Sequence, residues 1–203
     1  MDIKERIITE SGILFSKYGI RSMTMDAISS EMRISKRTIY EHFRDKETLL
    51  QEVILYHNNL QAEEANHIIE QSNNAIEAMF LILRQSIRIM KQINPVFFYD
   101  LTTYYASTFN RFSEHSKNRN YDFTLNLLQT GVRQKVFRNE LNIDIVNRTF
   151  HELFKLFSPD HPLTQKDYNR RELFDNIIIP YFRGIATEKG AELIEKCKKI
   201  LEY

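Results

Sequence analysis

The sequence has few of the residues that make turns or cross-links. It contains one cysteine, Cys197, with five glycines and four prolines among 203 residues. A single cysteine excludes an internal disulfide framework and fits a reducing compartment. Scarce turn residues, and the absence of any long run alternating apolar and polar residues, disfavour sheets and barrels. We therefore expect an all-α protein.

Long apolar runs are also missing. The charges of Asp2, Lys4, Glu5 and Arg6 interrupt the N-terminus, which excludes a signal peptide there. No stretch approaches the roughly eighteen apolar residues that a membrane span requires. We expect a cytoplasmic protein that does not partner with membranes.

An excess of charge of one sign is absent too. The net charge is +1, and 42% hydrophobic and 27% charged residues are ordinary for a globular protein. Any nucleic-acid surface must therefore be local. The segment 33–46 is such a place, because its five cations outnumber its two carboxylates for a net +3 (Arg33, Lys36, Arg37, Arg44 and Lys46 against Glu41 and Asp45).

Signatures of catalysis are not found. The six histidines are scattered, and Glu63 and His67, four apart, have metal-compatible spacing but no third ligand. A solvated pair explains them better. There is no phosphate-binding glycine loop and no nucleophile motif, and no base stands beside Cys197. We expect no catalytic residues, metal or cofactor. An all-helical enzyme would need a polar catalytic cluster, which the sequence does not offer.

The most informative stretch is Ser35 to Phe43, with the short helix before it, Met25 to Met32. Ser35 is a good helix N-cap. Ile39 and Phe43 lie four residues apart and share one face, while most residues between them are polar or basic. Such a helix packs one face on a core and presents donors to phosphates and base edges on the other. On the spacing alone, an ordinary amphipathic helix with a solvated face is the more common explanation.

A resemblance favours the DNA-binding interpretation. From Ile7 to Leu50 the chain resembles the N-terminal domain of TetR-family transcriptional regulators. The matching residues are Leu14-Phe15, Tyr18-Gly19, Thr24-Met25-Asp26-Ala27-Ile28, Ile34 through Phe43, and Asp45-Lys46-Glu47-Thr48-Leu49-Leu50. One departure is Met32-Arg33, where the family usually has a small residue and a glycine. Because glycine relieves strain at positive φ, Arg33 indicates a slightly different turn or an added phosphate contact.

The resemblance implies a DNA-binding site. Thr24, Tyr40, His42 and Lys46 are expected to grip phosphates, and Asp45 with Lys46 opens a helix whose free N–H groups suit a phosphate. At the start of the recognition helix, base edges come within reach. The full set of DNA-binding candidates is Thr24, Ser35, Lys36, Arg37, Thr38, Tyr40, His42 and Lys46. Alternatively, Tyr40 is a half-buried core residue and the lysine and arginine lie on a solvated face.

Together with the helical pattern, the resemblance implies a helix-turn-helix domain over residues 1–48 and a larger helical effector-binding and dimerisation domain over 49–203. The first domain has a core of Phe15, Ile28, Ile39 and Phe43. A connector helix begins at about Asp45 and reaches Gln71. Further helices are expected over 75–93, from Pro95, over 121–135, from Asn142, from a Thr164–Asp167 capping box through a kink at Pro180, and over 191–201. The polar segment 113–120 is compatible with either a loop or a helix.

Aromatic residues are frequent in the second domain. The resemblance implies that some of them line a pocket for a small-molecule effector, and such a pocket would suit an apolar or aromatic compound. The alternative is plain core, which is the more common role of aromatic residues at helical spacing. The candidates are Phe97, Phe98, Tyr99, Tyr104, Tyr105, Phe109, Phe112, Tyr121, Phe123 and Phe154.

The same resemblance implies the remaining partners. The segment 130–141 resembles the family's stretch before its eighth helix, and in the family the last two long helices form a four-helix bundle with a second subunit. We expect a homodimer through about 142–157 and 167–187 that binds near-palindromic double-stranded DNA. The expected function is a ligand-responsive repressor. The alternative is a small-molecule-binding or scaffold protein of the same fold without DNA-binding activity.

Overall fold

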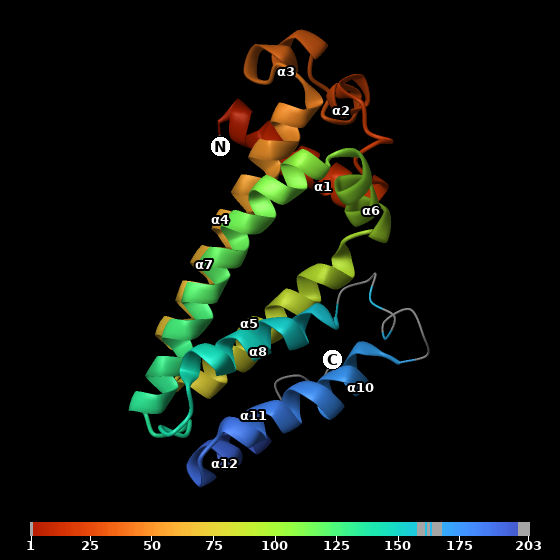
Figure 1. Cartoon of the computed structure of the whole chain (residues 1–203). Coiled ribbons are helices and arrows are strands. Elements are labelled where there is room, and N and C mark those ends of the chain that lie inside the picture. The colour runs from red at the N-terminus through yellow and green to blue at the C-terminus, as the bar shows by residue number, and fades with distance from the viewer. Residues whose placement is uncertain (1, 158–160, 162, 164–167, 199–203) are drawn as a thin grey trace. The chain divides into compact units, whose positions relative to one another are not determined.

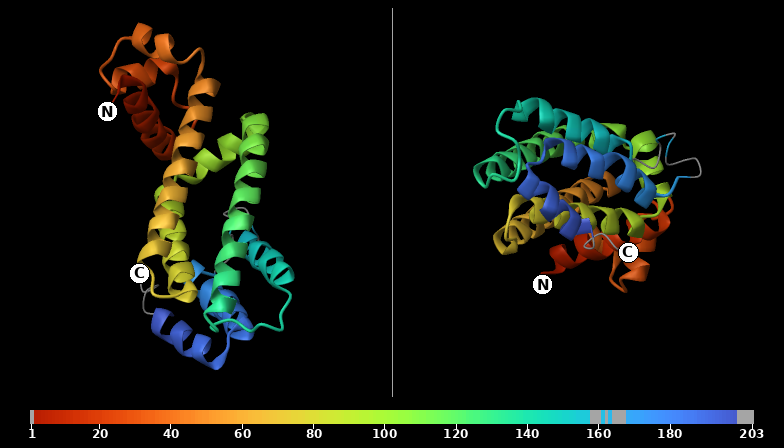
Figure 2. Two further views of the ribbon diagram at one scale, coloured as in Figure 1. Left: turned by 90° about the vertical axis from the view of Figure 1, so that its left-hand side faces the viewer. Right: turned by 90° about the horizontal axis from the view of Figure 1, so that it is seen from below.

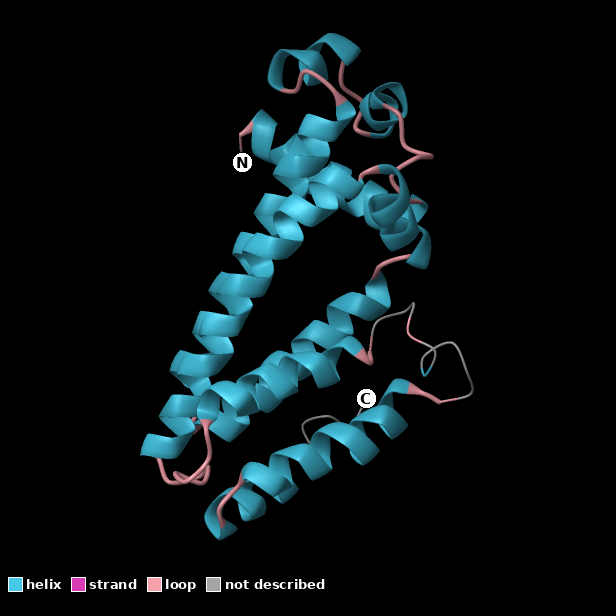
Figure 3. Cartoon of the chain, viewed as in Figure 1, coloured by secondary structure: helices cyan, strands magenta, loops and turns pink. Residues whose placement is uncertain are grey.

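The structure is a computed structural model that describes the whole chain except residues 1, 158–160, 162, 164–167 and 199–203. Every regular element of the described residues is a helix, as Figure 3 shows. The described residues fall into two compact units. Unit 1 lies within Met1–Glu64 and Ile87–Ser116, and unit 2 within Ala65–Ser86 and Lys117–Tyr203. The all-α prediction is confirmed.

The N-terminal part of unit 1 consists of α1 (Ile3–Tyr18), α2 (Met25–Glu31), α3 (Lys36–His42) and the start of α4 (Lys46–Gln71), labelled in Figure 1. All four residues predicted for its core are buried, with Phe15, Ile28 and Ile39 at 0% exposure and Phe43 at 1%. Leu49 and Leu50 of α4 complete this core at 0% exposure, so the connector helix is part of the domain's own packing. Tyr18, the last residue of α1, lies outside this core and is 45% exposed.

The turn between α2 and α3 keeps the geometry that glycine usually takes. Arg33 has φ 54°, in the left-handed region. Its N–H donates to the Ser30 carbonyl at 3.1 Å, and the Ile34 N–H donates to the Ser29 carbonyl at 3.0 Å. These two bonds form a Schellman motif, in which the last carbonyls of a helix are satisfied by a left-handed residue. The expectation of a different turn is therefore wrong, because arginine accepts the strained conformation.

The rest of unit 1 comes from the end of α5 (Ala75–Gln92), from α6 (Pro95–Tyr104) and from the start of α7 (Ala106–Arg133). Asn94 caps α6 by accepting from the Val96 N–H at 3.0 Å, and its own N–H donates to the Ser16 carbonyl of α1 at 2.9 Å. The buried Asp100 accepts a hydrogen bond from the Arg21 N–H at 2.8 Å. Helix α6 is thus tied by polar contacts to the end of α1 and the turn that precedes α2.

Helix α7 is much longer than the sequence predicted. The expected helix over 121–135 begins instead at Ala106 and spans 28 residues, and the polar segment 113–120 is helical. The segment has few apolar residues, so its periodicity is weak, and helical structure there is stabilised by continuity with the better-packed turns on both sides.

Unit 2 is built around aromatic residues of α5, α8 (Ile143–Lys155) and the C-terminal helices. Phe182, at 0% exposure, lies 5.7 Å from Phe80 and 5.6 Å from Phe150 between ring centroids. Phe174 makes an edge contact with Phe80 at 6.1 Å. The views in Figure 2 allow α8 and the C-terminal helices to be followed from two further sides. Asn142 caps α8, as the sequence predicted, by accepting from the N–H groups of Asp144 and Ile145.

The C-terminal helices differ in detail from the expectation. The Thr164–Asp167 capping box falls on positions outside the described residues. The chain then forms α10 (Arg170–Leu173), a π-helical turn η1 (Phe174–Ile178) and α11 (Ile179–Ile185). Pro180 has no N–H and its ring crowds the carbonyl one turn back, and a wider π turn accommodates this without ending the helix.

The last helix, α12 (Glu188–Cys197), begins before Gly190 and not after it. Thr187 is its N-cap and accepts from the Gly190 N–H at 3.1 Å. Gly190 lies against the backbone of Val136, whose carbonyl oxygen would be 2.0 Å from a Cβ at this position. The glycine is therefore required for close packing and does not act as a helix break.

Candidate nucleic-acid interface

Helix α3 separates a buried face from an exposed one. Ile39 is fully buried, whereas the side chain of Arg37 is 88% exposed and that of Lys36 57%. Tyr40 is 46% exposed, so about half of its surface is free to contact another molecule. His42 is exposed beside the buried Phe43. The arrangement leaves polar and basic groups on the face that is free to meet another molecule.

Both short helices are capped by hydroxyl groups from the candidate set. The Thr24 hydroxyl accepts from the Ala27 N–H at 3.1 Å, and the Ser35 hydroxyl accepts from the Thr38 N–H at 3.0 Å. Each hydroxyl can accept one bond and still donate its own proton. Ser35 Oγ lies 2.7 Å from Thr38 Oγ1, so one of these two hydroxyls donates a hydrogen bond to the other. Thr24 keeps an exposed hydroxyl at the start of α2, where a phosphate oxygen is a suitable acceptor.

The two cations that open α3 each contact a carboxylate. Lys36 Nζ lies 2.6 Å from Asp26 Oδ1 and 2.8 Å from Asp26 Oδ2, which joins α3 to α2. The hydrogen bond to Asp26 raises the pKa of Lys36. Arg37 Nε lies 2.8 Å from Glu41 Oε1, one turn further along the same helix. Sequence reasoning did not single out Asp26 and Glu41, although the Arg37–Glu41 spacing of four residues was a visible signal.

The start of α4 is more occupied than the sequence indicated. Asp45 Oδ1 accepts from both the N–H and the hydroxyl of Thr48 at 2.8 Å, and Arg44 Nε lies 2.9 Å from Asp45 Oδ2. The bonds from Thr48 are the main cause that lowers the pKa of Asp45 to about 2, with Arg44 adding to them. Lys46 Nζ donates to the Ile20 carbonyl at 3.0 Å. A phosphate at this helix start would therefore meet a fixed carboxylate as well as the remaining N–H groups.

The aromatic effector candidates are divided between the two units. Phe97, Tyr105 and Phe109 are partly buried and pack against the core of unit 1. Tyr104 is 48% exposed, and the guanidinium carbon of Arg21 lies over its ring, 4.2 Å from the ring centroid. The remaining candidates of unit 1 are the half-buried Phe98 and Phe112 and the exposed Tyr99.

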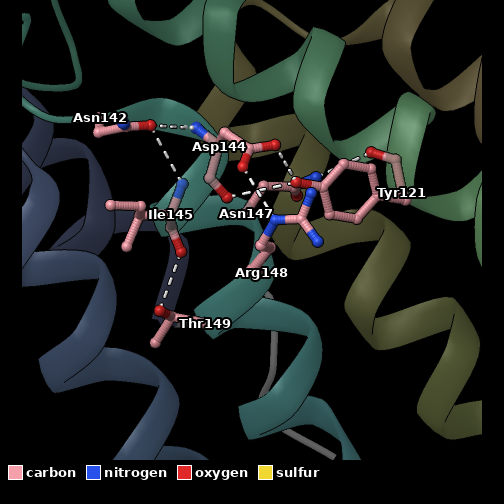
Figure 4. A network of polar contacts seen from close by, with 7 residues as sticks. All are labelled: Tyr121, Asn142, Asp144, Ile145, Asn147, Arg148 and Thr149. Carbon is pink, nitrogen blue, oxygen red and sulfur yellow. Dashed lines mark hydrogen bonds and ion pairs between the residues drawn. The ribbon is translucent and has the colours of Figure 1, made fainter.

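The other three candidates, Tyr121, Phe123 and Phe154, belong to unit 2 and are half-buried. Tyr121 takes part in the polar network of Figure 4: its hydroxyl donates to Asp144, which also pairs with Arg148 at 2.9 Å. The bond to Arg148, followed by that to Tyr121, lowers the pKa of Asp144. This network joins α7 to α8.

A buried part of the same network fixes one histidine tautomer. Asn147, at 0% exposure, donates from Nδ2 to the Tyr121 carbonyl at 2.9 Å, so its Oδ1 must accept from the Thr124 hydroxyl at 2.6 Å. Thr124 has a single proton, and therefore His151 Nε2, 2.8 Å away, must be the donor to Thr124. Burial lowers the pKa of His151. The side chains of Asn147, Thr124 and His151 are thus joined to one another by hydrogen bonds within unit 2.

The remaining chemical candidates have structural partners. His67 Nε2 lies 2.9 Å from the Gln71 amide nitrogen. Cys197 is buried, and this burial raises the pKa of its thiol to about 11, which makes it a poor nucleophile. Among the described residues no group of three or more histidine, cysteine, aspartate and glutamate side chains is placed to hold a metal ion. No helix in the described part of the chain combines the length and apolar character of a membrane span.

Comparison with known proteins agrees with this geometry. Residues 7–53 match the family described as "Bacterial regulatory proteins, tetR family". The HTH-type transcriptional regulator YvaF of Bacillus subtilis is 24% identical over 190 residues, which cover 93% of this chain and 98% of that protein. The matched family segment contains α2, α3 and every DNA-binding candidate.

Two solved structures show the same fold over most of the chain. One is a transcriptional regulator from Saccharomonospora viridis in complex with choline, with TM-score 0.67 and 19% identity, covering 91% of this chain and 98% of that one. The other is AibR in complex with isovaleryl coenzyme A and operator DNA, with TM-score 0.56 and 17% identity, covering 87% and 96%. Residues 7–53 thus match the helix-turn-helix domain of TetR-family transcriptional regulators, and the chain as a whole shares the fold of these two regulators, with an N-terminal helix-turn-helix domain and a helical C-terminal domain.

Proposed function

We propose that this regulator is a ligand-responsive repressor that binds a near-palindromic operator as a homodimer. The observation that carries the proposal is the exposed face of α3, where Lys36, Arg37 and Tyr40 stand opposite the buried Ile39. A helix with one face fixed in a core and cations on the other can lie in a major groove and reach base edges.

The roles of the candidate residues follow from their positions. Arg37, the most exposed of the cations that open α3, is suited to bidentate pairing with guanine O6 and N7, which discriminates by about 1–3 kcal/mol. Lys36 and Thr38 supply further donors at the same helix start. Thr24, Tyr40, His42 and Lys46 contact phosphates and set the register of the helix in the groove, and Ser35 caps the start of that helix.

The operator symmetry follows from the proposed dimer. Two copies of the chain pair through about 142–157 and 167–187, and their heads meet successive major grooves about 34–36 Å apart or a multiple of that distance. AibR, a structural relative, was solved with operator DNA and a coenzyme A ester, which supports a DNA-binding protein that also responds to a small molecule.

The effector site is proposed within the helical domain over residues 49–203, with the aromatic candidates of unit 2, Tyr121, Phe123 and Phe154, as its lining. A small molecule acts by binding one conformer better than another, and DNA is released if that conformer holds the heads at the wrong spacing. The needed difference in affinity is modest, because a coupling of about 1–3 kcal/mol changes DNA affinity by roughly 5–150-fold.

The test is selection of bound DNA from a pool of random duplexes, repeated with Arg37→Ala and Tyr40→Phe. Wild-type protein is expected to enrich a near-palindrome. Arg37→Ala is expected to relax the preference at one base pair in each half-site, and Tyr40→Phe to weaken binding to all sequences alike. If wild-type protein enriches no sequence at low salt, with or without added cell extract as an effector source, the proposal is wrong.

A further inference from the structure

The cations that open α3 are restrained by two carboxylates on different elements. Asp26, in the first turn of α2, holds Lys36 Nζ with both of its oxygens, at 2.6 and 2.8 Å. Glu41, in the last turn of α3, holds Arg37 Nε at 2.8 Å. All four side chains are more than half exposed. Exposed pairs of this kind add little to folding stability, so stability does not explain their presence on this face.

The carboxylates have a clear electrostatic effect on this surface. Counting Asp26 with the segment 33–46, five cations stand against three carboxylates, which leaves a net +2 in place of +3. Binding to the phosphate backbone without sequence preference depends on such local positive charge and on the counterions that it displaces from DNA. Carboxylates next to the leading cations therefore weaken binding to unrelated sequences.

The position of Glu41 also affects the direction of Arg37. The carboxylate contacts Nε, the guanidinium nitrogen nearest the helix, while the side chain as a whole is 88% exposed. The far edge of the guanidinium, with its two Nη groups, is left to a partner. That edge can make two parallel hydrogen bonds to guanine O6 and N7. A guanidinium held at one end loses less conformational freedom when the other end binds.

From these contacts we infer that Glu41 and Asp26 are positioning residues that set sequence specificity, with Glu41 aiming Arg37 at a base edge and Asp26 doing the same for Lys36. This inference rests on the proposed function. The two carboxylates lower affinity for phosphates in general and direct the two cations to hydrogen-bond acceptors in the groove of the correct operator. They increase the ratio of specific to nonspecific binding and not the affinity for DNA as such.

The test compares Glu41→Gln, Glu41→Ala and Asp26→Asn with wild-type protein on two duplexes, the sequence enriched by wild type and a shuffled version of it. Affinity is measured between 50 and 200 mM salt, and each variant is also put through the random-pool selection. Glu192→Gln is the matched control, because it removes one negative charge from an exposed position in unit 2. Thermal melting checks that the variants are folded.

Each variant has a distinct expected result. Glu41→Gln and Asp26→Asn bind the shuffled duplex roughly threefold or more tightly than wild type, because a negative charge near the phosphates is gone. Glu41→Gln keeps an oxygen that can accept from Nε and so keeps the base preference. Glu41→Ala loses that acceptor, and its preference at the Arg37 base pair falls by about fivefold or more. Glu192→Gln behaves as wild type.

Two failures are distinguishable. If wild type enriches a sequence but the variants bind both duplexes as wild type does, with an unchanged base preference, the inference is wrong and the proposed function stands. If wild type enriches nothing, the proposed function fails, and the inference fails with it. An equal gain for Glu192→Gln would also overturn the inference, since the effect would then come from net charge alone.

Discussion

At the scale of single residues, Arg33 shows how sequence and conformation conflict at the turn before the recognition helix. Its φ of 54° is a conformation that costs an L-residue roughly 1–2 kcal/mol relative to the right-handed region. The strain persists because α2 and α3 are held on both sides by buried residues, and because Arg6 Nη2 donates to the Met32 carbonyl beside the turn at 3.2 Å.

A glycine at this position should therefore stabilise the fold. We expect Arg33→Gly to raise the free energy of unfolding by about 1 kcal/mol, since glycine adopts positive φ without a steric cost. Chemical denaturation measures the change. Arg33→Ala is the control, because alanine removes the charge but keeps the strain, and it should give no comparable gain. Equal stability of the glycine and alanine variants would mean that the backbone at this turn is not strained.

At the scale of elements, what could be predicted from the sequence depended on how local the signal was. Thr24, Ser35 and Asn142 are caps that act within three residues, and the helices they open were predicted correctly. The start of α7 was missed because residues 113–120 carry little apolar periodicity. The role of Gly190 was missed because its reason, contact with Val136, is fifty-four positions away in the chain.

The same limit applies to the candidate site. The residues of α3 could be chosen from their order in the sequence, and Arg37–Glu41 follows from helical spacing. The Asp26–Lys36 contact could not be foreseen, because it depends on how α2 packs against α3. The division of the aromatic candidates between two units likewise depends on tertiary packing and has no signature in their spacing.

Two glycines within helices allow the packing of the C-terminal elements to be tested. We expect Gly190→Ala to lower the free energy of unfolding by about 2 kcal/mol or more, because a Cβ there would overlap the Val136 carbonyl oxygen. Gly184→Ala is the matched control in α11, where a Cβ would meet nothing within 4 Å. Alanine should stabilise that position by about 0.5–1 kcal/mol. If urea unfolding shows the same sign of change for both variants, the close packing at Gly190 is incorrect.

At the scale of the whole molecule, the net charge of +1 means that tight binding to DNA would have to come from local charge and, in the proposed dimer, from the pairing of two copies. The proposed dimer surface includes α8, whose Ile145 is 60% exposed in the single chain. If this isoleucine is exposed in the monomer and covered in the dimer, the burial of its apolar surface contributes favourably to the free energy of association.

Replacing this isoleucine by a charge should separate the copies. We expect Ile145→Asp to raise the dimer dissociation constant at least about tenfold, because the carboxylate would be desolvated in the interface. Sedimentation equilibrium measures this. Ile13→Asp is the control, since Ile13 is 59% exposed but lies on α1, outside the proposed interface. Should Ile145→Asp and Ile13→Asp associate equally well, the dimer surface lies elsewhere.

The most direct measurement of the central claim is equilibrium binding of wild-type protein and Arg37→Ala to the selected duplex and to a shuffled duplex between 50 and 200 mM salt. Specific recognition through α3 predicts that wild type prefers the selected duplex by about 10³-fold or more, that affinity falls steeply with salt, and that Arg37→Ala loses roughly 5–150-fold of the preference for each half-site. Equal affinity of wild-type protein for the two duplexes, or a preference that Arg37→Ala leaves unchanged, would contradict recognition of DNA by this helix.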